Sequence, residues 1–151
     1  MSLHSAPTIF SLTLRALSRY PDRLAFKWRD SELTYAATLK MIGRMQHVLR
    51  TQAMKPGQRL ALLTANRADA WCIGIAAQGL GITTTWLHPM GAIQAHCFQL
   101  EDADVSAVLI DASNYLARGA EIAAHMPGLK VFTLGASPYG IDILSLAEHS
   151  P

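Results

Sequence analysis

The sequence predicts an α/β fold with a largely parallel sheet and helices on both faces. Short, mostly apolar segments bounded by turn residues recur along the chain, and such segments are typical of strands covered on both faces. Longer segments with helical periodicity separate them, as the crossover helices of a parallel sheet would. Half of the 151 residues are apolar and 16% are charged, which is enough apolar material for the core of one folded domain.

A helix and a hairpin are expected first. The helix covers 8–20, where the threonine at its start can act as the N-cap and Pro21 ends it. Apolar and polar residues then alternate over 24–29, and a second short segment follows at 32–35. The turn residues Asp30 and Ser31 between them predict a short hairpin.

The clearest amphipathic helix follows Thr34, which can cap it. Its apolar residues recur at spacings of three or four and so share one face: Tyr35, Leu39, Ile42, Met45 and Leu49. Turn residues at 55–58 end this unit. The almost continuous apolar run at 59–63 then predicts a strand that is buried on both faces.

Strands and helices alternate after this point. Asn66 is expected to cap a helix over 70–80, with Asp69 as the acidic partner in a variant of the capping box. The further elements in chain order are a strand at 82–87, a loop at 88–91, a helix at 92–102, a strand at 105–110, a helix at 112–125 and a strand at 129–134. A short apolar piece at 143–147 is expected to lack a partner within this chain.

Charge and cysteine usage exclude several classes of function. The formal net charge is +2, and the 13 Lys and Arg residues form no run that could follow a phosphate backbone, so no nucleic acid partner is expected. The longest apolar stretch, 70–82, is too short to span a bilayer, and we expect a cytoplasmic protein. Cys72 and Cys97 lack the close pairing of a zinc or redox motif, and we expect both to be buried like small apolar residues.

Four blocks of sequence between 17 and 111 follow one another in a specific order. They read PD..A followed by LTY (21–35), KPGQRLALLTANRAD (55–69), LGI followed by TWLHP (80–89), and FQLEDAD (98–104). Each block contains caps, turns and strand residues that many α/β proteins share. Their order and spacing together resemble the superfamily of acyl-CoA synthetases, luciferases and adenylation domains.

The resemblance implies that 1–151 is the first part of the large N-terminal domain of an acyl-adenylate-forming enzyme. In that arrangement 1–35 is a helix plus a hairpin, 36–135 alternates helices and strands, and 136–151 is a tail cut before the next elements. The implied parent is an ATP-dependent fatty-acid–CoA ligase, which forms an acyl-adenylate and then an acyl-CoA thioester. Its reactants would be a carboxylate such as a fatty acid, ATP with Mg²⁺, and CoA.

The residues that carry this chemistry in the family have no match in this chain. They are a glycine-rich phosphate loop with a lysine, an acid that binds the ribose, and a C-terminal lysine. We therefore expect no catalytic residue, no bound cofactor and no activity from this chain alone. Two alternatives stay open, an adenylating enzyme that loads a carrier protein and a complete small non-catalytic α/β binding module. An exposed sheet edge could also support a homodimer.

The loop at 88–91 holds the candidate binding residues. Ligands of α/β folds gather beyond the carboxyl ends of strands, where this loop is expected to lie. The resemblance implies that it approaches the CoA nucleotide in the full enzyme. We therefore expect His88 and Met90, with Gln99 on the following helix, to lie near that site. The alternative is that the loop only makes a turn and these side chains only pack.

Three further groups of residues are assigned no site. His88, His96 and Cys97 do not have the spacing of a known metal site. Gly79 and Gly81 lack the third glycine and the preceding strand of a dinucleotide motif. Three acidic residues are expected at the solvated end of the predicted helix 92–102: Glu101, Asp102 and Asp104.

Overall fold

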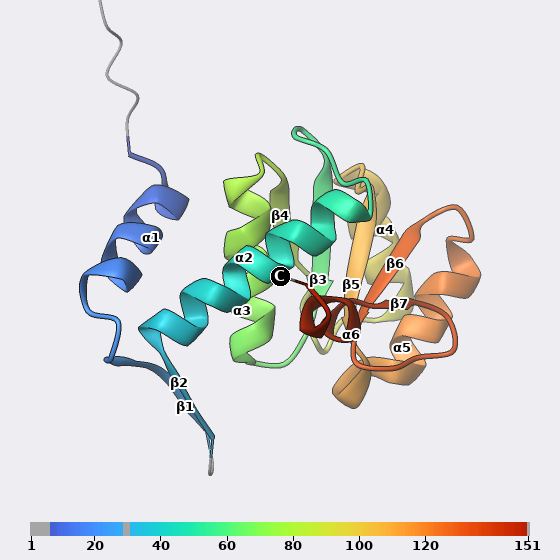
Figure 1. The fold of residues 1–151 in the computed structure, drawn as a ribbon. Helices are drawn as coiled ribbons and strands as arrows, with labels where there is room; N and C mark the ends of the chain where they lie inside the picture. The colour runs from blue at the N-terminus through green and yellow to red at the C-terminus, as the bar shows by residue number, and fades with distance from the viewer. Residues whose placement is uncertain (1–6, 29–30, 151) are drawn as a thin grey trace, which may run out of the picture.

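The computed structural model describes residues 7–28 and 31–150 and has the predicted α/β architecture (Figure 1). A five-stranded parallel sheet has the strand order β4-β3-β5-β6-β7, and a separate two-stranded hairpin precedes it in the chain. The helices are α1 (Ile9–Arg19), α2 (Tyr35–Thr51), α3 (Ala68–Gly79), α4 (Ile93–Asp102), α5 (Ala112–His125) and α6 (Ile143–Glu148). The strands are β1 (Leu24–Trp28), β2 (Ser31–Thr34), β3 (Arg59–Leu63), β4 (Thr83–Trp86), β5 (Ala107–Asp111), β6 (Lys130–Leu134) and β7 (Ile141–Asp142).

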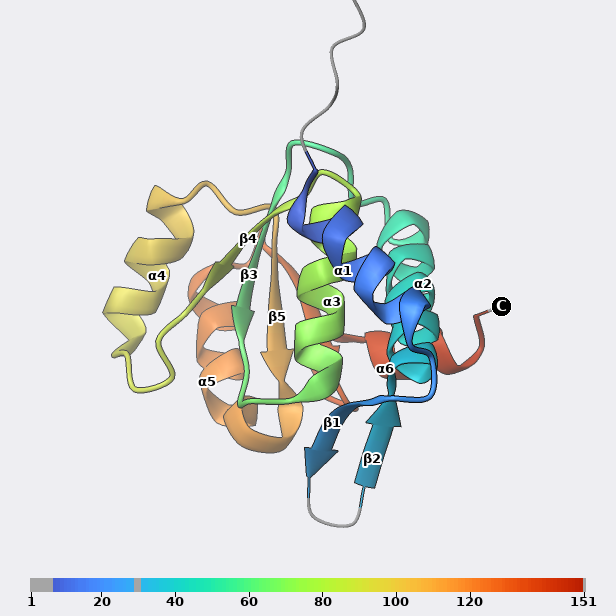
Figure 2. The ribbon, with the colours of Figure 1, turned by 90° about the vertical axis from the view of Figure 1, so that its left-hand side faces the viewer.

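The first helix and the hairpin form as predicted. The side chains of Thr8 and Ser11 each bind the other residue's backbone N–H, which makes a capping box at the start of α1. β1 and β2 pair antiparallel, and the side chain of Thr34 then caps α2 by accepting from the N–H of Ala37 at 3.2 Å. Of the two predicted turn residues, Asp30 lies outside the described residues and Ser31 begins β2. The hairpin extends away from the main sheet, beyond the ends of α2 and α3 (Figure 2).

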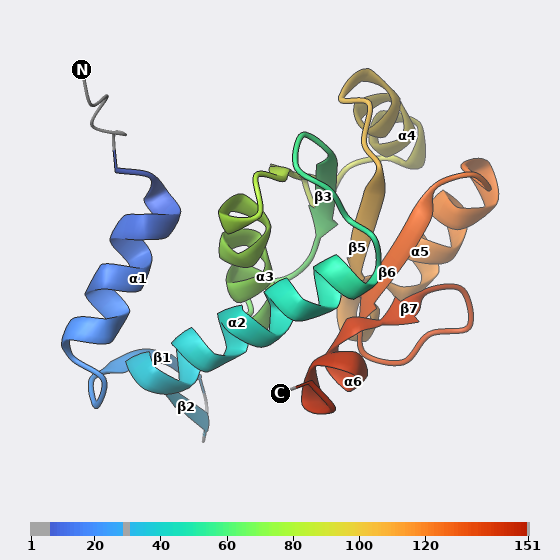
Figure 3. The ribbon, with the colours of Figure 1, turned by 45° about the horizontal axis from the view of Figure 1, so that its top comes forward.

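Successive residues of the buried strands serve two separate cores, because their side chains alternate between the faces of the sheet. Leu60 and Leu62 pack with α2, α3 and α6 on one face. Ala61 and Leu63 pack on the other, where Leu100 of α4 and Ile122 of α5 complete the core. Figure 2 shows the two groups of helices on opposite sides of the strands, and Figure 3 shows α1 outside α2 and α3. The predicted helices on both faces of a parallel sheet are confirmed.

The predicted cap of α3 is wrong. Asn66 is exposed and does not cap the helix, which begins at Ala68 with Arg67 in the N-cap position and no side-chain cap. Asp69 lies in the first turn, as predicted, but its Oδ1 accepts from the Nε of Arg67 and from the N–H of Ala70. The expected capping box does not form because the Asp69 carboxylate is bound by the guanidinium of the neighbouring Arg67.

The prediction that 143–147 lacks a partner is also wrong. Asp142 ends β7, which pairs with β6, and its carboxylate caps α6 by accepting from the N–H of Leu144 at 3.0 Å. Ile143 is fully buried and Ala147 is 6% exposed, because α6 packs against α2 and β6. Residues 143–147 therefore belong to the short helix α6, which packs on the core that contains Leu60 and Leu62. A run of this length does not show helical periodicity in the sequence.

No helix within residues 7–28 and 31–150 is both long enough and apolar enough to cross a lipid bilayer.

Candidate functional site

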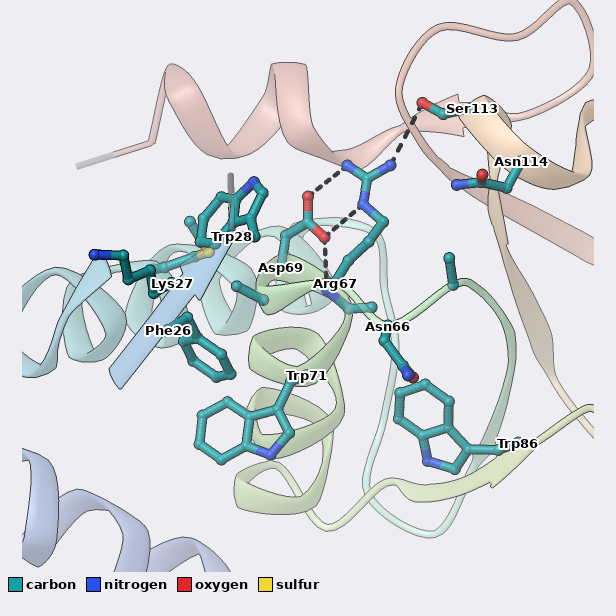
Figure 4. A pocket seen from close by; sticks show the side chains of 14 residues that line it. Phe26, Lys27, Trp28, Asn66, Arg67, Asp69, Trp71, Trp86, Ser113 and Asn114 are labelled. Carbon is teal, nitrogen blue, oxygen red and sulfur yellow. Dashed lines mark hydrogen bonds and ion pairs between the residues drawn. The ribbon is translucent and has the colours of Figure 1, made fainter. Parts of the chain in front are cut away.

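The loops that follow β3, β4 and β5 meet at one edge of the sheet, because parallel strands end at the same edge. A cavity of about 850 Å³ lies between this edge, the hairpin and the start of α3 (Figure 4). Aromatic side chains make much of its wall: Phe26, Trp28, Trp71 and Trp86. Its polar lining is Lys27 from the hairpin and the residues that follow β3 and β5: Asn66, Arg67, Asp69, Ser113 and Asn114.

Arg67 is the central charged residue of this edge. Its Nε and Nη2 donate to the two carboxylate oxygens of Asp69 at 2.9 and 2.6 Å, and its Nη1 donates to Asp111 at 2.8 Å. The hydrogen bond to Asp69 is the main reason that the pKa of Arg67 lies above its usual value. With two carboxylates on one guanidinium, the cluster carries a net negative charge. It is therefore unsuited to bind a phosphate group.

Asp111 joins the loops after β3 and β5. Its carboxylate is fully buried and accepts from Arg67, from the N–H groups of Ala65 and Ser113, and from the Nδ2 of Asn114 at 2.7 Å. Four donors satisfy this buried charge, as burial requires. Asp111 therefore holds the polar wall of the cavity in place, with no free oxygen left to act as an acid or base.

The aromatic wall is partly open to solvent. Phe26 and Trp71 make an edge-to-face contact with ring centroids 5.3 Å apart, which ties the hairpin to α3. Trp86 at the end of β4 is 53% exposed and packs over Gly74. Figure 4 shows Arg67 and Asp69 between Trp28 and Trp86. The cavity offers flat apolar surfaces beside a neutralised arginine, which suits an apolar or aromatic group better than an anion.

The structure brings two of the three predicted binding residues together. His88 and Met90 both lie in the exposed loop after β4, where the Nδ1 of His88 accepts from the N–H of Met90 at 3.2 Å. The Met90 side chain is 85% exposed. Gln99 is exposed on α4, and no hydrogen bond joins it to either residue in the described part of the chain. None of the three lines the aromatic cavity.

The residues that organise this edge are not among the predicted binding residues. Asp111 ends β5, Ser113 lies just after it, and Arg67 lies in the segment that follows β3. The rule that ligands gather at carboxyl ends of strands applies to these positions as much as to the 88–91 loop. The pairing of Arg67 with Asp111 spans 44 positions and leaves no local pattern.

Residues 7–28 and 31–150 contain no group of three or more His, Cys, Asp or Glu side chains that could hold a metal ion. His96 is fully buried, His88 is exposed, and Cys97 is partly exposed. The acidic residues near the end of α4 are exposed, as predicted: Glu101, Asp102 and Asp104. Gly79 ends α3 and Gly81 has a φ of +72°, so this pair closes a helix.

The two cysteines differ in their surroundings. Cys72 on α3 is fully buried, and this burial raises the pKa of its thiol to about 12. Cys97 on α4 is only partly buried, which raises the pKa of its thiol as well. The prediction that both are buried therefore holds for Cys72 and is wrong for Cys97, which is partly exposed.

Comparison with known proteins finds one family across most of the chain. A family model described as "AMP-binding enzyme" matches residues 14–141. The medium/long-chain-fatty-acid–CoA ligase FadD8 of Mycobacterium tuberculosis is 26% identical over 84% of this chain and 23% of its own length. The 2-succinylbenzoate–CoA ligase of Bacillus subtilis is 29% identical over 62% of this chain and 19% of its own length.

A solved structure agrees with these matches. The amide bond synthetase McbA from Marinactinospora thermotolerans has a TM-score of 0.79 and 25% identity, over 88% of this chain and 27% of its own. This chain therefore corresponds to less than a third of each of these proteins.

Proposed function

Because the chain belongs to the AMP-binding enzyme family, we propose that it is the amino-terminal part of an ATP-dependent acid–CoA ligase. The observation that carries the proposal is the match of the family model to residues 14–141, which contain all four sequence blocks. The chain would supply one sheet and its helices to a larger domain. We expect the ligase to work in the cytoplasm.

The proposed reaction has two steps. A carboxylate oxygen of the acid attacks the α-phosphorus of ATP, and the bond to the leaving pyrophosphate breaks. The thiolate of CoA then attacks the acyl carbonyl carbon of the acyl-adenylate, and AMP leaves. Mg²⁺ would neutralise phosphate charge in the first step, and we place its ligands and the phosphate loop outside this chain.

We propose a fatty acid as the substrate. The support is the FadD8 relative, which matches 84% of this chain and acts on medium and long fatty acids by its name. The test uses the full-length gene product with ATP, CoA and a panel of fatty and aromatic acids. Pyrophosphate release and mass spectrometry of the thioester report the two steps. A thioester formed only with aromatic acids would refute the fatty acid assignment.

The CoA nucleotide is proposed to lie beside the 88–91 loop. His88 and Met90 are exposed there, and Gln99 is exposed on the next helix, so all three can reach a ligand. In the full-length enzyme we expect His88→Ala to raise the KM for CoA and leave the KM for ATP unchanged. The control is His47→Ala, an exposed histidine on α2. An unchanged KM for CoA would remove the support for this site.

An amine is the second candidate for the acyl acceptor. The observation that favours it is the similarity to an amide bond synthetase at 25% identity. Incubation of the full-length protein with acid and ATP, with either CoA or a primary amine, separates the two. A thioester supports the ligase, and an amide formed without CoA supports the second candidate.

The chain by itself is proposed to be inactive. The charged groups that line the aromatic cavity are already paired, Arg67 with Asp69 and Asp111 and Lys27 with Glu32, and we place the phosphate loop and the catalytic lysine outside this chain. Residues 1–151 should therefore release no pyrophosphate from ATP in the presence of a fatty acid. Release above the level of a heat-treated control would contradict this.

A further inference from the structure

Two residues beneath the 88–91 loop form a connected polar cluster between α4 and α5. His96 is fully buried on α4, and its Nε2 lies 2.8 Å from the carbonyl oxygen of His88. Arg118 of α5 donates from Nη1 to the carbonyl oxygen of Gly91 at 2.5 Å, and the same nitrogen lies 3.3 Å from the Nδ1 of His96. Both carbonyl groups that these side chains contact belong to the loop.

The chemistry of the partners fixes the form of the His96 ring. A guanidinium has only donors, so the Nδ1 of His96 must accept from Arg118. The carbonyl of His88 has only an acceptor, so the Nε2 of His96 must carry the proton and donate to it. The ring is therefore neutral with its proton on Nε2, and each of its nitrogens has a partner on a different element. A ring bound in this way has one orientation.

The loop backbone fits closely against this ring. A Cβ atom at Gly91 would lie 2.8 Å from the Cδ2 of His96 and 3.1 Å from the carbonyl oxygen of His88. Glycine is thus the residue that lets the loop reach both side chains. Glu121 lies 2.7 Å from the Nε of Arg118 at ion-pair distance, without hydrogen-bond geometry, and so balances the charge of the half-buried guanidinium.

We propose that His96 and Arg118 are positioning residues that hold the 88–91 loop by its backbone carbonyl groups. A histidine that only fills space could be replaced by leucine without a change in the loop, whereas a histidine that binds the loop could not. The consequence for catalysis rests on the proposed function. The fixed loop would present the exposed His88 and Met90 side chains to CoA, and neither His96 nor Arg118 would touch it.

The first experiment measures the loop directly in the 151-residue chain. His96→Leu removes both hydrogen bonds of the ring, and His96→Gln keeps an amide donor near the position of Nε2. Amide hydrogen exchange at Met90 and Gly91 should become faster by about tenfold or more in His96→Leu and recover in part in His96→Gln. Imidazole ¹⁵N shifts of the wild type should show the proton on Nε2. The matched control is His47→Leu on the exposed side of α2.

Unchanged exchange in His96→Leu, or a proton on Nδ1 in the wild type, would overturn the proposal. If His96→Leu does not fold, Arg118→Met gives the same measurement, because methionine has no donor for the Gly91 carbonyl oxygen.

The second experiment uses the full-length enzyme and separates this proposal from the proposed function. His96→Leu should raise the KM for CoA several-fold and leave the KM for ATP and the rate of pyrophosphate release unchanged. A faster-exchanging loop with an unchanged KM for CoA would overturn the link to CoA. A wild type that uses no CoA would refute the proposed function, and the exchange measurement would still decide whether the two residues hold the loop.

Discussion

Asp111 is a fully buried carboxylate whose charge is balanced by Arg67. Replacing Arg67 by methionine would leave this charge buried without its counter-ion, and such losses cost about 3–5 kcal/mol in the free energy of unfolding. We predict a loss near the lower limit, about 3 kcal/mol, because three uncharged donors to Asp111 remain. Urea unfolding followed by circular dichroism measures the difference.

The reason for this loss can be tested with a second substitution. Asp111→Asn removes the buried charge, so the double variant with Arg67→Met should be more stable than Arg67→Met alone. Lys27→Met is the matched control, since Lys27 pairs with Glu32 at an exposed site where ion pairs contribute about 0–1 kcal/mol. Equal losses at Lys27 and Arg67 would show that burial of Asp111 is not the cause.

The buried thiol of Cys72 makes the free energy of unfolding depend on pH in the alkaline range. Burial first, and the nearby Asp69 carboxylate second, raise the pKa of its thiol from 9.0 to about 12. Between these values the unfolded chain has lost the thiol proton and the folded chain keeps it. The free energy of unfolding should therefore fall as pH rises through this window, by up to about 1.4 kcal/mol per pH unit from this residue. Below pH 9 its contribution is fully present.

The measurement compares the wild type with Cys72→Ala in urea at a series of pH values above and below this window. The wild type should lose stability more steeply with pH than the variant, because only the wild type has the buried thiol. Cys97→Ala should change the slope less, since that thiol is partly exposed. Parallel curves for wild type and Cys72→Ala would contradict the prediction.

At the scale of elements, the sequence predicts strands and helices well where one pattern dominates. β3 and α5 have the predicted bounds, because a continuous apolar run and a long periodic segment each admit one interpretation. The predicted Asn66 cap of α3 is wrong because the hydrogen bonds between Arg67 and Asp69 compete with the local capping pattern. α6 was missed as a helix because its burial depends on α2, which lies far away in the sequence.

For the candidate site too, local sequence patterns predict some features, and other features depend on contacts between distant parts of the chain. His88 and Met90 are predicted binding residues because they lie in the loop that follows a predicted strand, and their role stays a prediction. Arg67 and Asp111 come together only when β3 and β5 pair, and Arg118 reaches the 88–91 loop only when α4 packs on α5. Strand order and helix packing are properties of the tertiary structure, so no local pattern in the chain predicts these contacts.

Gly119 marks a close contact between α5, β5 and the loop before β7. A Cβ there would lie 2.7 Å from the Cγ2 of Ile110 and 2.8 Å from the Cζ of Tyr139. The hydroxyl of Tyr139 also donates to the carbonyl oxygen of Leu116 at 2.8 Å, which limits how far the ring can move. We predict that Gly119→Ala lowers the free energy of unfolding by about 1–3 kcal/mol through overpacking.

Gly43 provides the matched control for this substitution. It lies on the exposed side of α2, and a Cβ there would meet no atom within 4 Å. Gly43→Ala should raise the free energy of unfolding by about 0.5–1 kcal/mol, because alanine loses less backbone entropy in a helix. Urea unfolding of both variants gives the comparison. A stabilising Gly119→Ala would show that Tyr139 or Ile110 moves away without cost.

At the scale of the whole molecule, the sheet has edges that can pair with another chain. In the described part of the chain β4 pairs with β3 on one side only, and its Trp86 is 53% exposed. Exposed edges of this kind promote strand pairing between molecules, and a charged side chain on the edge opposes it. The 151-residue chain should therefore form dimers or larger species as its concentration rises.

Sedimentation equilibrium over a range of concentrations tests this prediction with two matched variants. Trp86→Lys places a charge on the β4 edge and should shift the chain toward monomer. Phe98→Lys removes a similarly exposed aromatic side chain, 66% exposed on α4, and should leave self-association unchanged. Equal effects of the two variants would point to general apolar adhesion instead of strand pairing, and a wild type that stays monomeric at every concentration would refute pairing through this edge.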